Sequence, residues 1–376
     1  MNKKVLIIAF FSILILLPLF SILLPKDTFS QTENRPLQQF VAPTKENLLS
    51  REFMDSFEKF LADHLVFREA FIKIKTDLEL AQGKKEINNI FISDKMLLEH
   101  IQLKDKSVVD ANIKAINDFA RKYKSTAQIS TMLVPTAAAF YPEKNPSRAT
   151  LLDQPEFCKQ FYNDLVDVTA IDAYSFLAAN KGDYLYYKTD HHWTSLGAYW
   201  GYSALAKPLG FKPIARDMFN IEHASHDFLG TLYSKALYGE KLKDVVDIYH
   251  YADNAVQVTE TIKNTGTQTQ TYPSILFRKF LNEKDKYSVF LGSNDPMVTI
   301  KSDLKNGKKI LIFKDSYTNA LMQFLPLHYE EITLLDLRYV NKSLSEYVDF
   351  TDYSQILFLY NVANIISDNN ILKIMN

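Results

Sequence analysis

The order of hydrophobic and polar positions near the N-terminus predicts a membrane-spanning helix. Residues 5–24 carry no charge and are interrupted only by two serines and a proline, a run long enough to cross a hydrocarbon core about 30 Å thick. Lys3 and Lys4 precede the run, and the positive-inside bias places such a tail in the cytoplasm and the rest of the chain outside it. The run ends in Leu24-Pro25-Lys26 without a small-residue cleavage site, so we expect residues 1–25 to remain as an anchor rather than to be cleaved as a signal.

The next two segments differ in their hydrophobic periodicity. Residues 26–45 are polar with scattered Pro and Thr, and this composition predicts a linker. From residue 46 to residue 80, apolar side chains recur at helical spacing with charges between them, which predicts a pair of amphipathic helices.

Farther along the chain, segments with helical periodicity alternate with short apolar runs that suit strands. The predicted helices cover residues 113–123, 155–165, 195–209 and 317–325, and the predicted strands cover 128–134, 166–173, 309–313, 332–335 and 355–360. This alternation is typical of an α/β fold in which a parallel sheet is covered by helices on both faces. Residues 222–288 are richer in Thr, Tyr and Gln and less periodic, so we expect an insertion or a β-hairpin region there, within one domain of residues 46–376.

Composition narrows the class of protein. The chain has 376 residues, 47% of them hydrophobic, which is enough for a large core. With 43 basic and 44 acidic residues and no dense basic stripe, nucleic acid is not an expected partner. No GxGxxG or GxxxxGK pattern occurs, which argues against nucleotide cofactors. The single cysteine, Cys158, excludes an intramolecular disulfide, and we expect it to be inert.

One segment with chemical potential is Lys188-Thr189-Asp190-His191-His192-Trp193. If its backbone is extended, Asp190 and His192 share a face and His191 points the opposite way. Asp190 would then hold Nδ1 of His192 and leave Nε2 free as a general base. The alternative is a surface loop in which Asp190 caps the helix that begins near Ser195.

A second segment places Ser316 at the junction between an apolar strand and a helix. A hydroxyl there lies at the carboxyl edge of the sheet, beside helix N–H groups that are ready to stabilise an oxyanion. The alternative is that Ser316 or Thr318 only caps the helix. Together the two segments supply a nucleophile, a base and an orienting acid.

Longer stretches around these residues resemble a known family. The sequences DHHWTSLGAYWGY (190–202) and KDSYTNALMQFLPLHYEEITLLDLRY (314–339) are similar to those of the DHHW protein family, which is related to the SGNH-like acetyltransferases of alginate and other exopolysaccharides. Further similar patches lie at residues 63–68, 134–135, 141–142, 228–234 and 290–294, so the resemblance covers most of the chain from Glu46 onward.

The resemblance implies a role for each residue of the two segments. Asp190 corresponds to the orienting acid, His192 to the base and Ser316 to the nucleophile. The acid and histidine precede the serine, the reverse of ordinary SGNH hydrolases, which implies an SGNH-hydrolase-like fold with circularly permuted motif order. Lys314 replaces the usual glycine before the Asp-Ser pair, and we place the oxyanion hole at the N–H of Ser316 with Gly292 or Asn294.

Other residues have two interpretations each. Arg338 binds an anionic sugar or forms a structural ion pair, and Tyr187 and Trp193 line a sugar cleft or belong to the core. His191 with His192 and Asp190, and the pair His223 and His226, offer metal-ligand atoms. Neither set has a helical HExxH context, so we expect no metal and no cofactor.

These observations predict acyl chemistry at the outer face of the cell membrane. Ser316, deprotonated by His192, would take an acetyl group and pass it to a hydroxyl of a cell-surface or secreted polysaccharide. The resemblance also implies a membrane-bound O-acyltransferase partner that supplies the acetyl group. The alternatives are a carbohydrate acetylesterase with the same residues, and a non-catalytic, membrane-tethered protein that binds or assembles polysaccharide.

Overall fold

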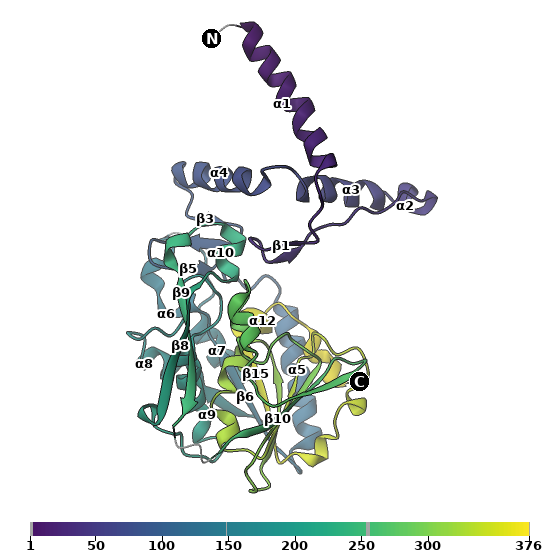
Figure 1. Ribbon diagram of the computed structural model, residues 1–376. Coiled ribbons are helices and arrows are strands. Elements are labelled where there is room, and N and C mark those ends of the chain that lie inside the picture. The colour runs from purple at the N-terminus through teal and green to yellow at the C-terminus, as the bar shows by residue number, and fades with distance from the viewer. Residues whose placement is uncertain (1–2, 148, 253–255, 376) are drawn as a thin grey trace.

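A computed structural model describes residues 3–147, 149–252 and 256–375 and shows a mixed α/β fold around a large central sheet (Figure 1). Residues 1 and 2 of the predicted anchor, residues 253–255 of the segment 222–288, and residue 376 lie outside the described ranges. The eight strands of the sheet have the order β11-β10-β12-β14-β13-β15-β6-β7.

Five neighbouring strands of this sheet are parallel, as the alternating pattern predicts. They are β6 (Gln128–Val134), β7 (Thr169–Asp172), β13 (Lys309–Lys314), β14 (Glu331–Leu335) and β15 (Gln355–Asn361). Each lies within a residue or a few residues of a predicted strand. Four of them, β6, β13, β14 and β15, are buried over almost their whole length, as expected for strands covered on both faces.

The sheet is mixed and not wholly parallel as predicted, because β10 (Val258–Asn264), β11 (Thr269–Tyr272) and β12 (Met297–Ser302) pair only antiparallel. β10 and β11 lie in the segment 222–288, where a β-hairpin region was one of the two expectations. Buried and half-buried residues alternate along β12, the pattern of a strand that meets the core on one face only. β8 (Phe219–Phe228) and β9 (Asp244–Tyr251) form a separate antiparallel pair. The segment 222–288 therefore contains β-hairpins.

Helices cover the two faces of the sheet over two separate cores. One core includes residues of α8 (Ala173–Ala179), α9 (Ser195–Ala206) and α11 (Tyr317–Leu321); the other includes residues of α5 (Lys106–Tyr123), α7 (Gln154–Asn163) and α12 (Val362–Ile365). Alternate side chains of each strand enter opposite cores, as Ile312 and Phe313 do. Cys158 lies in the second core, where burial raises the pKa of its thiol to about 12, which agrees with an inert residue.

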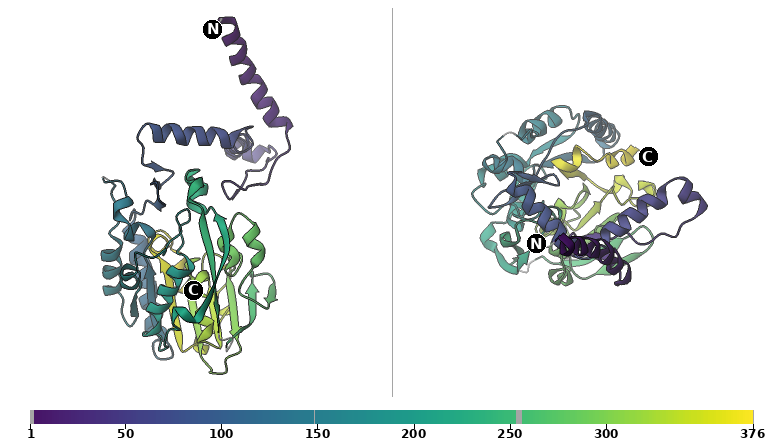
Figure 2. Two further views of the ribbon diagram at one scale, coloured as in Figure 1. Left: turned by 60° about the vertical axis from the view of Figure 1, so that its left-hand side comes forward. Right: turned by 90° about the horizontal axis from the view of Figure 1, so that it is seen from above.

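The N-terminal 81 residues project from one end of this body in Figures 1 and 2. α1 (Lys3–Leu23) is long and apolar enough to cross a membrane. The predicted linker contains a short hairpin, β1 (Phe29–Ser30) with β2 (Arg35–Pro36). The predicted pair of amphipathic helices corresponds to α3 (Glu52–Asp63) and α4 (Arg68–Ala81), and a short helix that was not predicted separately, α2 (Lys45–Leu49), precedes them. A small sheet of β3 (Glu86–Ile87), β4 (Ile90–Ile92) and β5 (Leu97–Glu99) follows α4, joins the N-terminal helices to the body and contacts α10 (Thr231–Ala236). The short helix α6 (Ala137–Phe140) follows β6 and also contacts β5.

Candidate active site

Ser316 lies at the carboxyl end of β13, where the chain turns into α11, as the sequence predicts. Its side chain is partly exposed, and its backbone has ordinary right-handed dihedral angles (φ −65°, ψ −17°). The hydroxyl makes no capping hydrogen bond to α11. Instead, Oγ lies 2.7 Å from Nε2 of His192. Ser316 therefore does not act as a helix cap, and its hydroxyl is available for chemistry.

The loop that carries Asp190 and His192 differs from the extended backbone that we expected. Residues 188–192 form a bend between Tyr186 and Trp193, which pair as an isolated antiparallel bridge. Oδ1 of Asp190 accepts the backbone N–H of His192 at 2.9 Å, an Asx turn. The same oxygen lies 2.6 Å from Nδ1 of His192, so the turn, and not strand alternation, joins acid and base.

Asp190 does not cap the helix that follows. The cap of α9 is Thr194, whose Oγ1 accepts the N–H of Gly197 at 3.2 Å. His191 does not point away from its neighbour either. Its ring lies 3.8 Å from that of His192, centroid to centroid, and its Nδ1 is 2.6 Å from Oγ1 of Thr231.

The three side chains of Asp190, His192 and Ser316 thus form one chain of hydrogen bonds. Because Oδ1 of Asp190 only accepts when ionised, Nδ1 of His192 carries the proton and Nε2 accepts from the Ser316 hydroxyl. This arrangement has the geometry in which a histidine can remove a proton from a serine while a carboxylate holds its ring.

The surroundings favour an ionised Asp190 and a neutral His192. Burial opposes ionisation of Asp190, but the two neighbouring histidines and the hydrogen bonds from His192 and Thr231 outweigh it and lower the pKa of the carboxyl group. Thr231 donates its N–H at 2.8 Å and its hydroxyl at 3.0 Å to Oδ2. Burial, followed by the charge of His191, lowers the pKa of His192 to about 4, although Asp190 acts in the opposite direction. His192 is therefore a free base at neutral pH.

Gly230 allows Asp190 to be buried in this position. A Cβ atom at residue 230 would collide with Cβ and Oδ2 of Asp190. Only a residue without a side chain lets the backbone approach the carboxylate so closely and place the N–H of Thr231 against it.

Aromatic residues clamp the two halves of the site together. Nε1 of Trp193 donates to the carbonyl of Tyr317 at 2.9 Å, and the hydroxyl of Tyr317 donates to the carbonyl of His191. Tyr287 stacks on the ring of His192 at 3.7 Å and an interplanar angle of 7°, and its hydroxyl donates to the carbonyl of Ser316 at 3.0 Å. These contacts hold the loop 190–193 against the turn at Ser316.

The side chains of Trp193 and Tyr187 have no solvent-exposed surface that a sugar could contact. Both are completely buried, so their placement in a sugar cleft is wrong and they belong to the core. The indole ring of Trp193 packs directly on α9 at Gly201, which has no side chain in the way. A Cβ atom added at residue 201 would lie 2.6 Å from the ring. Tyr187 packs edge-on against Phe228 and Tyr287.

The two residues before Ser316 shape the serine turn. Oδ1 of Asp315 accepts the N–H of Tyr317 at 3.0 Å, and Oδ2 accepts the N–H of Asn361 at 2.7 Å, which ties the turn to the end of β15. The buried ammonium group of Lys314 donates to Oδ1 of Asn319 at 2.7 Å and of Asn294 at 3.3 Å. Lys314, which stands where related serine motifs have glycine, thus connects the turn with Asn294.

The donors that we expected for an oxyanion are only partly free. The N–H of Gly292 already donates to the carbonyl of Ser288 at 3.0 Å, and the N–H groups of Tyr317 and Thr318 both donate to Asp315. The expected row of unused N–H groups at the start of α11 is therefore absent from the part of the chain that the structure describes. The N–H of Ser316 has no acceptor among the described residues.

Asn294 stays a predicted second donor. Its Oδ1 is turned toward Lys314, so its Nδ2 faces the other way. The loop around it is fixed by Lys263, whose Nζ donates to the carbonyls of Leu291 and Ser293, both at 2.7 Å, and pairs with Asp295 at 2.6 Å. Lys263 thus holds the backbone on both sides of Asn294.

Arg338 forms the structural ion pair that was one of its two interpretations. Its guanidinium group contacts both carboxylate oxygens of the buried Asp336, at 2.8 and 2.6 Å. Part of the guanidinium surface stays exposed, so contact with an anionic sugar stays a prediction.

The acid and the two histidines also resemble a set of metal ligands. Asp190, His191 and His192 bring their ligand atoms within 4.8 Å of one another. Both ring nitrogens of His192 are already engaged, by Asp190 and by Ser316, and Nδ1 of His191 contacts Thr231. These ligand atoms thus already have hydrogen-bond partners within the protein, and the absence of a metal stays a prediction. His223 contacts Asp247 instead, at 2.6 Å.

Sequence reasoning missed four residues that shape the site. Gly230 and Thr231 lie in the patch 228–234 that resembles the DHHW family, and this resemblance was a usable signal. Asp315 is part of the serine motif itself. Tyr287 stands alone between irregular segments, and nothing in its local pattern distinguishes it from a core aromatic.

Solved structures and a family model agree on one relationship. A DHHW family protein from Eubacterium siraeum superposes with a TM-score of 0.66 and 25% identity, covering 77% of this chain and 96% of that one. PatB1 from Bacillus cereus, solved with a sulfonyl adduct, has a TM-score of 0.65 and 22% identity over 76% of this chain and 99% of its own. No curated protein matches the sequence. The family model described as "DHHW protein" matches residues 82–335, more than half of the chain, and the chain therefore belongs to the DHHW family.

Proposed function

We propose that this protein transfers acetyl groups to hydroxyls of a cell-surface or secreted polysaccharide, with Ser316 as nucleophile, His192 as base and Asp190 as orienting acid. One observation carries the proposal: Oγ of Ser316 lies 2.7 Å from a neutral imidazole whose other nitrogen lies 2.6 Å from a buried carboxylate.

The geometry supports a two-step acyl transfer. His192 takes the proton of Ser316 as Oγ attacks the carbonyl carbon of the donor, and the N–H of Ser316 with Nδ2 of Asn294 stabilises the negative oxygen. The tetrahedral intermediate expels the donor's leaving group, which receives the proton from His192. A sugar hydroxyl then gives its proton to His192 and attacks the acetyl-Ser316 ester, which releases the acetylated sugar and restores the serine.

The distinction between transferase and esterase depends on whether a sugar hydroxyl or water reaches the acyl-enzyme. The DHHW resemblance, with its SGNH-like permuted motif order, favours transfer. A membrane-bound O-acyltransferase partner would supply the acetyl group, and α1 would hold the protein beside it as a single-pass anchor with its N-terminus in the cytoplasm and its site outside.

A chromogenic acetyl ester tests the serine mechanism on the purified full chain. We expect Ser316→Ala to reduce ester hydrolysis by about 10³-fold or more, because the nucleophile is lost. Ser367→Ala is the matched control and should leave the rate unchanged. Ser367 is exposed, and its hydroxyl donates a hydrogen bond to the carbonyl of Ala363. A sulfonyl fluoride should label Ser316, since PatB1 is known with a sulfonyl adduct.

Hydrolysis that survives Ser316→Ala would overturn the mechanism. If neither protein hydrolyses the ester but both bind oligosaccharide, the non-catalytic alternative would replace the proposal. With an acetyl ester and an oligosaccharide together, acetylated oligosaccharide identifies a transferase, and acetate alone identifies an esterase.

A further inference from the structure

The helix α4 has an apolar side that none of the described residues covers. Phe67, at its N-cap, and Phe71, Ile74 and Leu78 are between 45% and 72% exposed. Their spacing of four, three and four residues places them on one side of the helix, and we call them the apolar stripe. Four large side chains in one exposed row are far more than the scattered apolar residues of an ordinary surface.

The opposite side of α4 holds the helix on the body. Thr76 is buried and its hydroxyl donates to the carbonyl of Ala236 at 3.3 Å, while Leu80 packs against the small core around Ile87 and Leu232. Arg68 pairs with Glu33 of the β1–β2 turn. The apolar stripe therefore faces away from the body.

The neighbouring helices show the same outward display. Met54 and Leu61 of α3 are seven residues apart, which places them on one side of that helix, and both are exposed. Leu48 and Leu49 of α2 are exposed as well. In α2, no residue is buried, and the same holds for α3.

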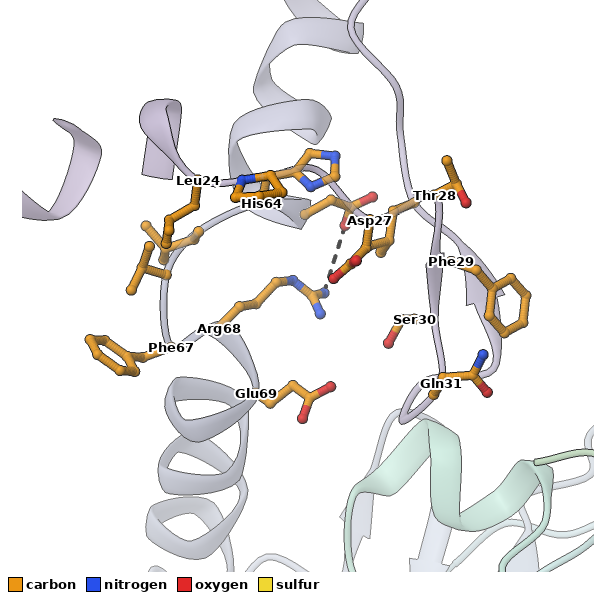
Figure 3. Close-up of a pocket in the computed structure, with 15 residues that line it drawn as sticks. Leu24, Asp27, Thr28, Phe29, Ser30, Gln31, His64, Phe67, Arg68 and Glu69 are labelled. Carbon is orange, nitrogen blue, oxygen red and sulfur yellow. Dashed lines mark ion pairs between the residues drawn. The ribbon is translucent and has the colours of Figure 1, made fainter. Parts of the chain in front are cut away.

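A direct contact joins these helices to the end of the apolar helix α1. Oγ of Ser21, in the last turn of α1, accepts the N–H of Val66, in the turn between α3 and α4, at 3.0 Å. Figures 1 and 2 show α3 and α4 extending crosswise from the base of α1, between it and the body. This turn borders a pocket whose lining includes Ser30 and Arg68. In the close-up, Arg68 points into this pocket and Phe67 points away from it (Figure 3).

We propose that α3 and α4 lie flat in the interfacial layer of the bilayer that α1 crosses, with the apolar stripe and the exposed apolar residues of α3 inserted at the boundary with the acyl chains. The contact between Ser21 and Val66 sets both helices at the level where α1 leaves the membrane. Amphipathic helices at that level bury their apolar side in lipid. The contact of α3 and α4 with the bilayer, in addition to that of α1, would fix the tilt of the body relative to the membrane. A single spanning helix would leave this tilt free.

The charges of this segment indicate which lipid property matters. Residues 45–81 contain six basic and eight acidic side chains. An attraction to anionic headgroups needs an excess of basic residues, so insertion of apolar side chains carries the contact, and anionic lipid is not required.

The test uses the full chain in phosphatidylcholine vesicles and does not depend on chemistry at Ser316. Single cysteines at Phe71 or Ile74 carry a nitrobenzoxadiazole fluorophore, and Lys73→Cys and Asp77→Cys, also exposed on α4, are the matched controls. Cys158 is buried and its thiol stays protonated, so the unsubstituted chain gives the background of labelling. Unchanged thermal unfolding in detergent shows that each variant is folded.

We expect the probes at 71 and 74 to emit at shorter wavelength and to be quenched by doxyl-labelled lipid, and those at 73 and 77 to be quenched by aqueous iodide. Adding phosphatidylglycerol should leave this pattern unchanged. Equal access of iodide to all four positions would overturn the proposal, as would release of the chain from vesicles by alkaline carbonate. Shielding at 71 and 74 without quenching by doxyl lipid would assign the stripe to a second copy of the chain.

Discussion

The turn at Ser316 and the helix α4 use large apolar side chains in opposite ways. Around Ser316, the rings of Trp193, Tyr287 and Tyr317 are buried, and each donates a hydrogen bond to a backbone carbonyl of Ser316, Tyr317 or His191. Along α4, Phe67 and Phe71 are exposed, and the opposite side of the helix, at Thr76, contacts the body.

The difference lies in the surroundings for which each region is built. A site that must hold a serine, a histidine and a carboxylate within a few tenths of an ångström needs supporting residues that are themselves packed. An apolar row without a protein partner is favourable only if another apolar phase covers it. Substitutions should therefore affect chemistry in the first region and membrane contact in the second.

The largest effect should come from Gly230→Ala. The added methyl group collides with Asp190, so the carboxylate must move and His192 loses its orientation. We expect ester hydrolysis to fall by roughly 10²–10⁴-fold, as when an orienting acid is lost. Gly182→Ala, where nothing lies within 4 Å of the added atom, is the matched control and should keep full activity. Equal activity of both variants would show that Asp190 does not need its present position.

A smaller effect should appear in the pH dependence. His192 must be neutral to accept the proton of Ser316, and its pKa is lowered to about 4, chiefly by burial and then by the charge of His191. We expect kcat/KM for ester hydrolysis to be flat from pH 7 to 5 and to fall about tenfold per unit below about pH 4. His191→Gln removes one lowering charge and should move the midpoint to higher pH.

Circular dichroism along the same titration separates loss of a neutral His192 from unfolding in acid. A midpoint near the ordinary histidine value of about 6.5 would mean that Asp190, which raises the pKa of His192, offsets the effect of burial.

The smallest effect should follow Phe71→Ala on the outward side of α4. Because Phe71 is exposed, its loss should change the free energy of unfolding in detergent by no more than about 0.5 kcal/mol and leave ester hydrolysis unchanged. Phe313→Ala, at a completely buried position of β13, should cost about 3–5 kcal/mol in the same measurement. A large cost for Phe71→Ala would mean that protein, and not lipid, covers the apolar stripe.

Much of the local structure was determined by the sequence itself. β6 begins and ends at the predicted residues. The other parallel strands and the apolar helix α1 were visible as apolar runs, and α3, α4, α5, α7, α9 and α11 as helical patterns, whereas the short helices α6, α8, α10 and α12 were not predicted. Periodicity is a local property, since it records which side of an element is buried. The same patterns placed Ser316 at the end of a strand and, with the DHHW resemblance, identified the family.

Tertiary structure alone decided how distant segments meet. Ser316 and His192 are 124 residues apart, and their contact at 2.7 Å depends on the pairing of β13 within the sheet and on the clamp formed by Trp193 and Tyr317. The side chain of Tyr287 over His192 comes from a third segment. No local pattern encodes such encounters, because they result from the packing of the whole core.

Three expectations failed for the same reason. The Asx turn at Asp190, the burial of Trp193 and the antiparallel pairing of β12 all follow from the neighbours that folding supplies. A sequence shows that residues 190–193 and 314–316 carry reactive and aromatic side chains, but whether these face substrate or core depends on what packs against them. The chain itself thus determined its elements and its chemical groups, and the tertiary structure determined their geometry, because local preferences act between near neighbours and packing acts across the whole fold.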